Sequence, residues 1–219
     1  LFPNTKWKKN NLGRGWVLGE TLITGIGQGY IQSTPLQLCM MTAQIANGGY
    51  AIKPKIIVDS NPISYEDAKQ SMESQLLFNS ESKLLGDKKL FKDKKNIKII
   101  QEAMFSSTNE RFGTSYKSRI DDPKYQFAGK TGTAQVKRIS KRERELDLEL
   151  EQIPYKDRDH ALYVAYGPYI NPRYALSIIV EHGGSGSKTA APIAKKLFKL
   201  IIDRHELRNE QSNFEEISI

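Results

Sequence analysis

The sequence predicts an α+β fold in which helices pack on an antiparallel sheet. Residues 161–166 and 174–181 are rich in strand-forming apolar residues, and the Gly167-Pro168 and Asn171-Pro172 pairs between them are a hairpin signal. Residues 127–136 form a further extended segment, which we expect to pair antiparallel with this hairpin. Apolar residues recur at helical spacing before and after these strands, so the strands are expected to lie between helices in the sequence.

A first helix is expected over residues 35–47. Thr34 is a suitable N-cap, Pro35 fits the first turn and Gln37 completes a capping box. Gly48-Gly49 supplies the stop signal. The apolar positions at helical spacing within this segment are Leu38, Met41 and Ile45.

Two more helices are expected over residues 97–105 and 189–205, and the tail from Glu206 onward is expected to fray. A short helical piece around residues 143–152 is expected inside a charged loop, and the polar, lysine-rich stretch 59–96 predicts a surface excursion. The glycines between 25 and 29 predict a tight loop. The periodic positions are Ile97, Ile100 and Met104 in the earlier helix, and Ile193, Leu197, Leu200 and Ile201 in the later one.

Length and composition favour one domain. A chain of 219 residues can bury about 70% of its unfolded surface in a single core. No apolar run approaches the roughly 20 residues of a membrane-spanning helix. The single cysteine, Cys39, lies in an apolar helical pattern and is expected to fill the core. His160, His182 and His205 have no metal-ligand spacing, so no metal site is expected.

The net charge of +8 raises the hypothesis of a nucleic-acid-binding protein. The basic residues gather at 6–9, 83–98 and 137–144, where they mix with acidic residues and lack interleaved aromatics. This distribution disfavours nucleic acid as a partner. A basic surface suits equally a partner near anionic lipid headgroups or an acidic polymer.

The chemistry of the chain concentrates in the segment from Ala128 to Ala134. This segment is a strand of small residues that carries one cation, Lys130, and two hydroxyls, Thr131 and Thr133, which alternate onto one face. Gly132 between them leaves room for a side chain or a ligand to cross the strand. Together these groups are suited to holding a carboxylate. A phosphate-binding P-loop is excluded, because Lys124 stands where its first glycine is required.

Lys130-Thr131-Gly132 resembles the third signature of the penicillin-recognising serine acyltransferases. Residues 112–115 resemble the short Gly-Thr segment that precedes this strand in the family. Further stretches are similar, in the same order, to the class B penicillin-binding proteins of the rod-shape elongation machinery. These stretches are residues 24–30, 34–38, 46–49, 129–136, 158–162 and 181–194.

The resemblance implies the second half of the penicillin-recognising serine transpeptidase or β-lactamase-like fold. It implies that residues 1–205 are the C-terminal part of one transpeptidase domain and that residues 206–219 are a C-terminal tail. It also implies that the 25–29 loop and the helix that follows it lie near the active site.

The activity implied is that of a peptidoglycan DD-transpeptidase, which binds D-Ala-D-Ala stem peptides and penicillin and forms a serine acyl-enzyme during cell-wall synthesis. Lys130, Thr131, Gly132 and Thr133 are then substrate-binding, with Lys130 and Thr133 as auxiliary catalytic groups. Implied partners are stem peptides, lipid-linked precursors, β-lactams, a membrane glycosyltransferase and other elongation proteins, with no nucleic acid, no metal and no cofactor. The implied location is the bacterial inner membrane, with this domain in the periplasm.

The first two family signatures, Ser-x-x-Lys with the nucleophile and Ser-x-Asn, are expected upstream of residue 1. The matches at Ser80, Ser107 and Ser185 are interpreted as coincidences, because they lie out of the family order. We therefore expect the chain to be the C-terminal part of a longer transpeptidase, beginning internally at Leu1. A β-lactamase or DD-carboxypeptidase of the same fold, and a non-catalytic binding module, stay open as alternatives.

Overall fold

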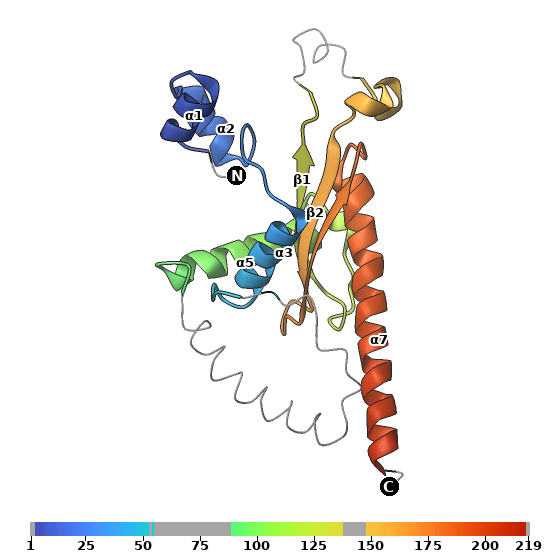
Figure 1. Ribbon diagram of the computed structural model, residues 1–219. Coiled ribbons are helices and arrows are strands. Elements are labelled where there is room, and N and C mark those ends of the chain that lie inside the picture. Colours follow the sequence, from blue (N-terminus) through green and yellow to red (C-terminus); the bar gives the residue numbers. More distant parts are fainter. Residues whose placement is uncertain (1–2, 53, 55–88, 138–147, 218–219) are drawn as a thin grey trace.

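The computed structural model describes residues 3–52, 54, 89–137 and 148–217 (Figure 1). Residues 59–88 of the predicted excursion at 59–96 and residues 143–147 of the predicted helical piece at 143–152 lie outside these residues. No helix within the described ranges is long and apolar enough to cross a membrane. The helices and strands are α1 (Thr5–Leu12), α2 (Leu18–Gly25), α3 (Pro35–Ala46), α5 (Lys94–Asn109), β1 (Ala128–Ala134), β2 (His160–Gly167), β3 (Tyr174–Val180) and α7 (Ala191–Ile217), with short turns η1 (Tyr116–Ser118), η2 (Leu150–Gln152), η3 (Tyr155–Asp157) and η4 (Gly186–Ala190).

The sheet consists of β1, β2 and β3 in that order, all antiparallel, as predicted. Lys130 lies opposite Val164 across the β1–β2 pair, and Thr133 lies opposite Ala161. Within the described residues, β1 is an edge strand, because only β2 pairs with it. The strand that carries the candidate site therefore keeps one side open.

One face of the sheet packs against α7, which runs along it (Figure 1). Phe127 stacks on Phe198 with ring centroids 4.9 Å apart, and both side chains are fully buried. Alanines on both elements remove bulk at this interface, which allows the helix to approach the strands closely. The fully buried alanines are Ala161, Ala165, Ala190, Ala191 and Ala194.

The opposite face packs against α3 and α5. Ile45 from α3 and Met104 from α5 meet Ala128 and Tyr166 from the sheet in a second buried cluster. Cys39 is half-buried rather than part of this core, and its Sγ lies 3.4 Å from the Ala175 carbonyl oxygen. Burial raises the pKa of the Cys39 thiol.

The predicted start of α3 is confirmed. The Thr34 hydroxyl accepts from the Gln37 amide at 3.2 Å, and the Gln37 side chain accepts from the Thr34 amide at 2.9 Å. The predicted helix at 97–105 is also present, within the longer α5, where the Asp93 side chain accepts from the Lys95 amide.

The prediction of a frayed tail after residue 205 is wrong, because α7 continues through Ile217. No glycine or proline follows Pro192, so nothing in the sequence stops the helix. Contacts from the segment before β1 also hold this part of α7: Lys124 pairs with Glu206, and the Tyr125 hydroxyl donates to Asp203.

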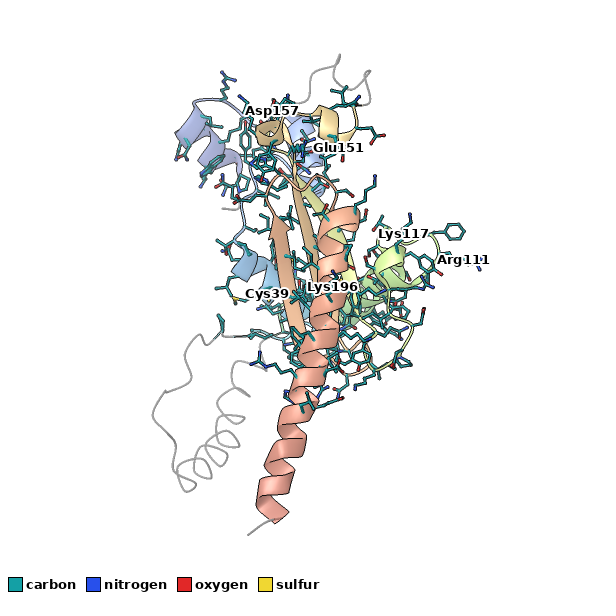
Figure 2. All side chains as sticks on the ribbon, turned by 90° about the vertical axis from the view of Figure 1, so that its right-hand side faces the viewer. Cys39, Arg111, Lys117, Glu151, Asp157 and Lys196 are labelled. Carbon is teal, nitrogen blue, oxygen red and sulfur yellow. The ribbon has the colours of Figure 1, made fainter. Side chains whose placement is uncertain are left out.

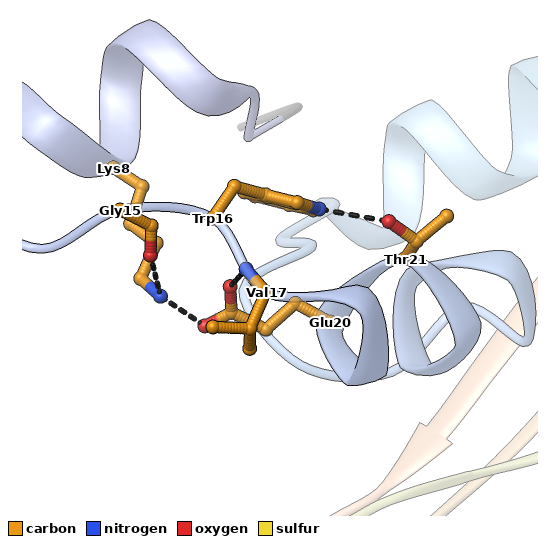
Figure 3. Close-up of polar contacts among 6 residues, drawn as sticks. All are labelled: Lys8, Gly15, Trp16, Val17, Glu20 and Thr21. Carbon is orange, nitrogen blue, oxygen red and sulfur yellow. Dashed lines mark hydrogen bonds and ion pairs between the residues drawn. The ribbon is translucent and has the colours of Figure 1, made fainter.

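Helices α1 and α2 were not predicted from the sequence. They are joined by the ion pair between Lys8 and Glu20, and the Lys8 ammonium also donates to the Gly15 carbonyl at 2.7 Å (Figure 3). The second Glu20 oxygen accepts from the Val17 amide at 2.9 Å, which caps the start of α2. The hydrogen bond from Lys8, followed by that from Val17, holds the pKa of the Glu20 carboxyl below its usual value.

Acid is expected to loosen this helix pair. Because the folded pKa of Glu20 is lowered, its stabilising effect is present above the usual glutamate pKa of about 4.3 and is lost as the pH falls through the lower folded value. Trp7 and Trp16 are the two tryptophans of the chain, so tryptophan fluorescence during an acid titration reports on this pair alone.

In the matched Glu20→Gln variant the neutral amide cannot titrate, and the acid step in fluorescence should disappear. An unchanged step in that variant would assign the transition to another group.

Candidate active site

The open edge of β1 has its carbonyl oxygens occupied by side chains. The carbonyl of Gly129 accepts from Thr108 at 3.5 Å, that of Thr131 from Lys130 at 2.9 Å and that of Thr133 from Gln28 at 2.8 Å. Just before the strand, the Phe127 carbonyl accepts from Asn109 at 2.9 Å. In an antiparallel pair, both backbone groups of a residue point to the same side of its strand. The N–H groups of Thr131 and Thr133 therefore also face the open edge.

These two N–H groups have no partner within the described residues. Since the neighbouring carbonyls are already bonded, the edge between Thr131 and Thr133 presents mainly hydrogen-bond donors. Such an edge favours an acceptor, namely a carbonyl oxygen, a carboxylate or an oxyanion.

A cation and hydroxyls lie at the same edge. The Lys130 ammonium lies 2.9 Å from the Thr131 carbonyl oxygen and 3.4 Å from its hydroxyl. The Thr131 hydroxyl is 3.3 Å from that of Thr114, which in turn is 3.2 Å from that of Ser107. The lysine thus adds positive potential to a row of donors, and the hydroxyls tie the strand to the 113–115 turn and to α5.

Two cavities flank this strand. The one on the side of α3 and α5 has a volume of about 580 Å³, is mostly apolar and has Lys130 in its wall. The other, of about 610 Å³, lies between Thr133 at the end of β1, the 148–159 segment and the turn before α7. Figure 2 labels Glu151 and Asp157 at this end of the sheet. Asp157 forms an ion pair there with Lys137 at 3.2 Å.

Gly129 of β1 packs against a buried network of three hydroxyl groups, those of Tyr163, Thr108 and Ser115. The Tyr163 hydroxyl lies 2.9 Å from that of Thr108 and 3.0 Å from that of Ser115. Burial raises the pKa of Tyr163, although both hydrogen bonds act in the opposite direction. A Cβ at Gly129 would lie 2.4 Å from the Tyr163 hydroxyl, so only glycine fits here.

The serines interpreted as coincidences have structural roles where they are described. Ser185 caps the turn η4, where its hydroxyl accepts from the Lys188 amide at 3.4 Å. Ser107 lies on α5 in the hydroxyl row, and it lines the apolar cavity together with Lys130. Ser80 lies outside the described residues.

The sequence did not reveal that His160 and His182 are neighbours. The His182 amide donates to His160 Nδ1 at 2.9 Å, and His182 Nδ1 donates to the Arg158 carbonyl at 2.9 Å. His182 has a φ of 56° at the third position of a local turn, which the Gly183 amide closes by donating to the Val180 carbonyl at 3.1 Å. Within the described ranges, no three His, Cys, Asp or Glu side chains are grouped to hold a metal ion.

Comparison with known proteins identifies the fold. The profile of the penicillin binding protein transpeptidase domain matches residues 3–199. The peptidoglycan D,D-transpeptidase MrdA of Salmonella typhimurium is 30% identical over 204 residues, which are 93% of this chain and 30% of the relative. MrdA of Acinetobacter baumannii is 33% identical over 196 residues, which are 88% of this chain and 26% of the relative. This chain therefore spans less than a third of the length of these relatives.

Solved structures agree. Penicillin-binding protein PBP2 of Helicobacter pylori, in its complex with MreC, matches with a TM-score of 0.64 and 30% identity, covering 91% of this chain and 31% of that one. PBP2 of Pseudomonas aeruginosa, in complex with WCK 5153, matches with a TM-score of 0.64 and 32% identity, covering 91% of this chain and 37% of that one. The predicted α+β transpeptidase fold is confirmed.

Gly129→Ala should lower the free energy of unfolding by about 1–3 kcal/mol, the usual cost of overpacking, because its methyl group meets the Tyr163 ring and hydroxyl. Urea denaturation of the purified protein measures the change. Gly25→Ala is the matched control, since a Cβ there meets open space on α2. Equal unfolding midpoints for the parent and Gly129→Ala would contradict the close packing.

Proposed function

Since this chain belongs to the family of penicillin-binding protein transpeptidase domains, we propose that it forms the C-terminal part of the transpeptidase domain of a PBP2-type peptidoglycan DD-transpeptidase. The enzyme cross-links stem peptides that end in D-Ala-D-Ala during cell-wall synthesis and rod-shape maintenance, and β-lactams acylate it. The observation that carries the proposal is the donor edge of β1, where Thr131 and Thr133 direct free N–H groups beside the Lys130 ammonium.

In this mechanism a serine outside the chain attacks the carbonyl carbon of the penultimate D-Ala and expels the terminal D-Ala, and an amine of a second stem peptide then releases the acyl group. The Thr133 N–H donates to the oxygen that becomes negative in the tetrahedral intermediate. The hydroxyls of Thr131 and Thr133 hold the terminal carboxylate. Lys130 supplies positive potential and a hydrogen bond to a relay serine, and Gly132 leaves space for the substrate.

The substrate peptide lies along β1 by β-augmentation, because an edge strand recognises an extended peptide through its backbone groups. The partners that follow are stem peptides on lipid-linked precursors, a membrane glycosyltransferase and other elongation proteins. The domain is assigned to the periplasm, with the enzyme anchored in the inner membrane.

A β-lactamase or DD-carboxypeptidase has the same donor edge but transfers the acyl group to water. The 30% sequence identity with the D,D-transpeptidase MrdA, over an alignment that covers 93% of this chain, favours the transpeptidase. The rate at which water releases the acyl group from the full-length protein separates these two functions, because a transpeptidase retains a penicilloyl group far longer than a β-lactamase does.

A fluorescent penicillin should label the full-length protein but not this chain alone. No serine of the described residues has a base placed to activate it, and the hydroxyls of Ser107 and Ser185 are bonded to other hydroxyls. Gel fluorescence after denaturation measures covalent labelling. A full-length protein that stays unlabelled would refute the proposed function, and label on this chain would refute the placement of the nucleophile.

Thr133→Val in the full-length protein keeps strand propensity and volume but removes a hydrogen bond to a charged group, worth about 1.5–3 kcal/mol. Penicillin acylation should slow roughly 10- to 150-fold, at tenfold per 1.36 kcal/mol. Thr133→Ser keeps the hydroxyl and should retain most of the rate, whereas Lys130→Ala should lose more than Thr133→Val. A purely structural threonine would reverse the order, with Val tolerated better than Ser.

A further inference from the structure

Gln28 touches the candidate site from a distant part of the sequence. Its side-chain amide donates to the Thr133 carbonyl oxygen at 2.8 Å, across 105 residues. Among the described residues, the other side chains that donate to carbonyl oxygens along this edge come from α5 or from β1 itself. Gln28 is therefore the contact through which the 26–30 loop reaches the strand beside its free N–H groups.

The loop fixes the position of Gln28 before any ligand binds. The backbone N–H of Gln28 donates to the Ile23 carbonyl at 3.0 Å, and the backbone N–H of Gly27 donates to the Thr24 carbonyl at 3.0 Å. These two bonds form the Schellman motif at the end of α2. Gly27 takes the left-handed φ of 76° that this arrangement requires. With the Gln28 backbone held in this turn, the side-chain torsions of Gln28 direct its side-chain amide to the Thr133 carbonyl oxygen.

The contact lies where β1 is weakest. The strand ends at Ala134, one residue beyond Thr133, and the chain then leaves the sheet. A terminal strand residue frays unless its backbone groups are held. A donor fixed on the Thr133 carbonyl restrains the rotation of the Thr133 backbone, and with it the direction of the Thr133 N–H.

We propose that Gln28 is a positioning residue of the transpeptidase: its amide clamps the Thr133 carbonyl so that the Thr133 N–H points at the reacting oxygen of the substrate. The inference rests on the proposed role of Thr133. Gln28 itself touches neither the substrate nor the nucleophile, and it acts through the strand. It links the fold of α2 directly to the geometry of the donor edge.

The first test replaces the donor in the full-length protein and follows penicillin acylation. Gln28→Met keeps the length of the side chain without its amide and should slow acylation about 3- to 10-fold, the effect of losing one neutral hydrogen bond. Gln28→Glu at neutral pH places a carboxylate against the carbonyl and should slow acylation further.

Protonation of the Gln28→Glu carboxyl restores a donor, so the ratio of variant to parent rate should rise as the pH falls through its pKa. Contact with the carbonyl favours the neutral form and raises that pKa above about 4.3. Gln135→Glu adds the same charge to an exposed position nearby, and its ratio to the parent should not rise in acid. A Gln28→Glu ratio that stays flat, or a Gln28→Met variant as fast as the parent, would overturn the proposal.

A second measurement does not depend on activity. Loss of the clamp should speed hydrogen exchange at the ladder amides of Gly132 and Ala134 in Gln28→Met, while the amides of β3 stay protected. If the parent is not acylated but exchange responds in this way, the proposed function fails and the clamp stands. If exchange in β1 is unchanged, the clamp is refuted whatever the activity.

Discussion

The rest of the structure depends on the way β1 shares its backbone hydrogen bonds. One side of the strand pairs with β2, and the other side must stay open without fraying. Side chains of Asn109, Thr108, Lys130 and Gln28 meet its outward carbonyls and leave the N–H groups of Thr131 and Thr133 unpaired. The edge is thereby restricted to ligands that bring acceptors, which suits a carboxylate and a developing oxyanion.

The helices on both faces of the sheet support the open edge of β1 by packing and by hydrogen bonds. Small residues let α7 and the turn before it press on one face, and a Cβ at Gly186 would lie 2.5 Å from the Leu162 carbonyl oxygen. On the other face, α5 supplies Thr108, which bonds to Gly129 of β1, and Asn109, which bonds to Phe127 just before the strand. The buried Tyr163 hydroxyl joins Thr108 and Ser115, so the strand rests on a network in which each hydroxyl has a partner.

The N-terminal helices are coupled to this edge through few contacts. The Lys8–Glu20 ion pair holds α1 to the start of α2, and the Schellman turn at the other end of α2 presents Gln28 to β1. The contact from Gln28 to Thr133 therefore joins the end of α2 to the strand. Gly27, with a φ of 76°, takes the left-handed conformation that this turn requires.

The sequence by itself determined the elements whose signals are local. The capping box at Thr34 and Gln37, the period-two runs of the hairpin and the small-residue strand with Lys130 all predicted structure correctly, because caps and alternation depend only on neighbours in the chain. The tertiary structure alone decided the rest. The reach of Gln28 to Thr133, the contact of His160 with His182 and the pairing of Lys124 with Glu206 on α7 join residues far apart in sequence, and no local pattern encodes such pairings.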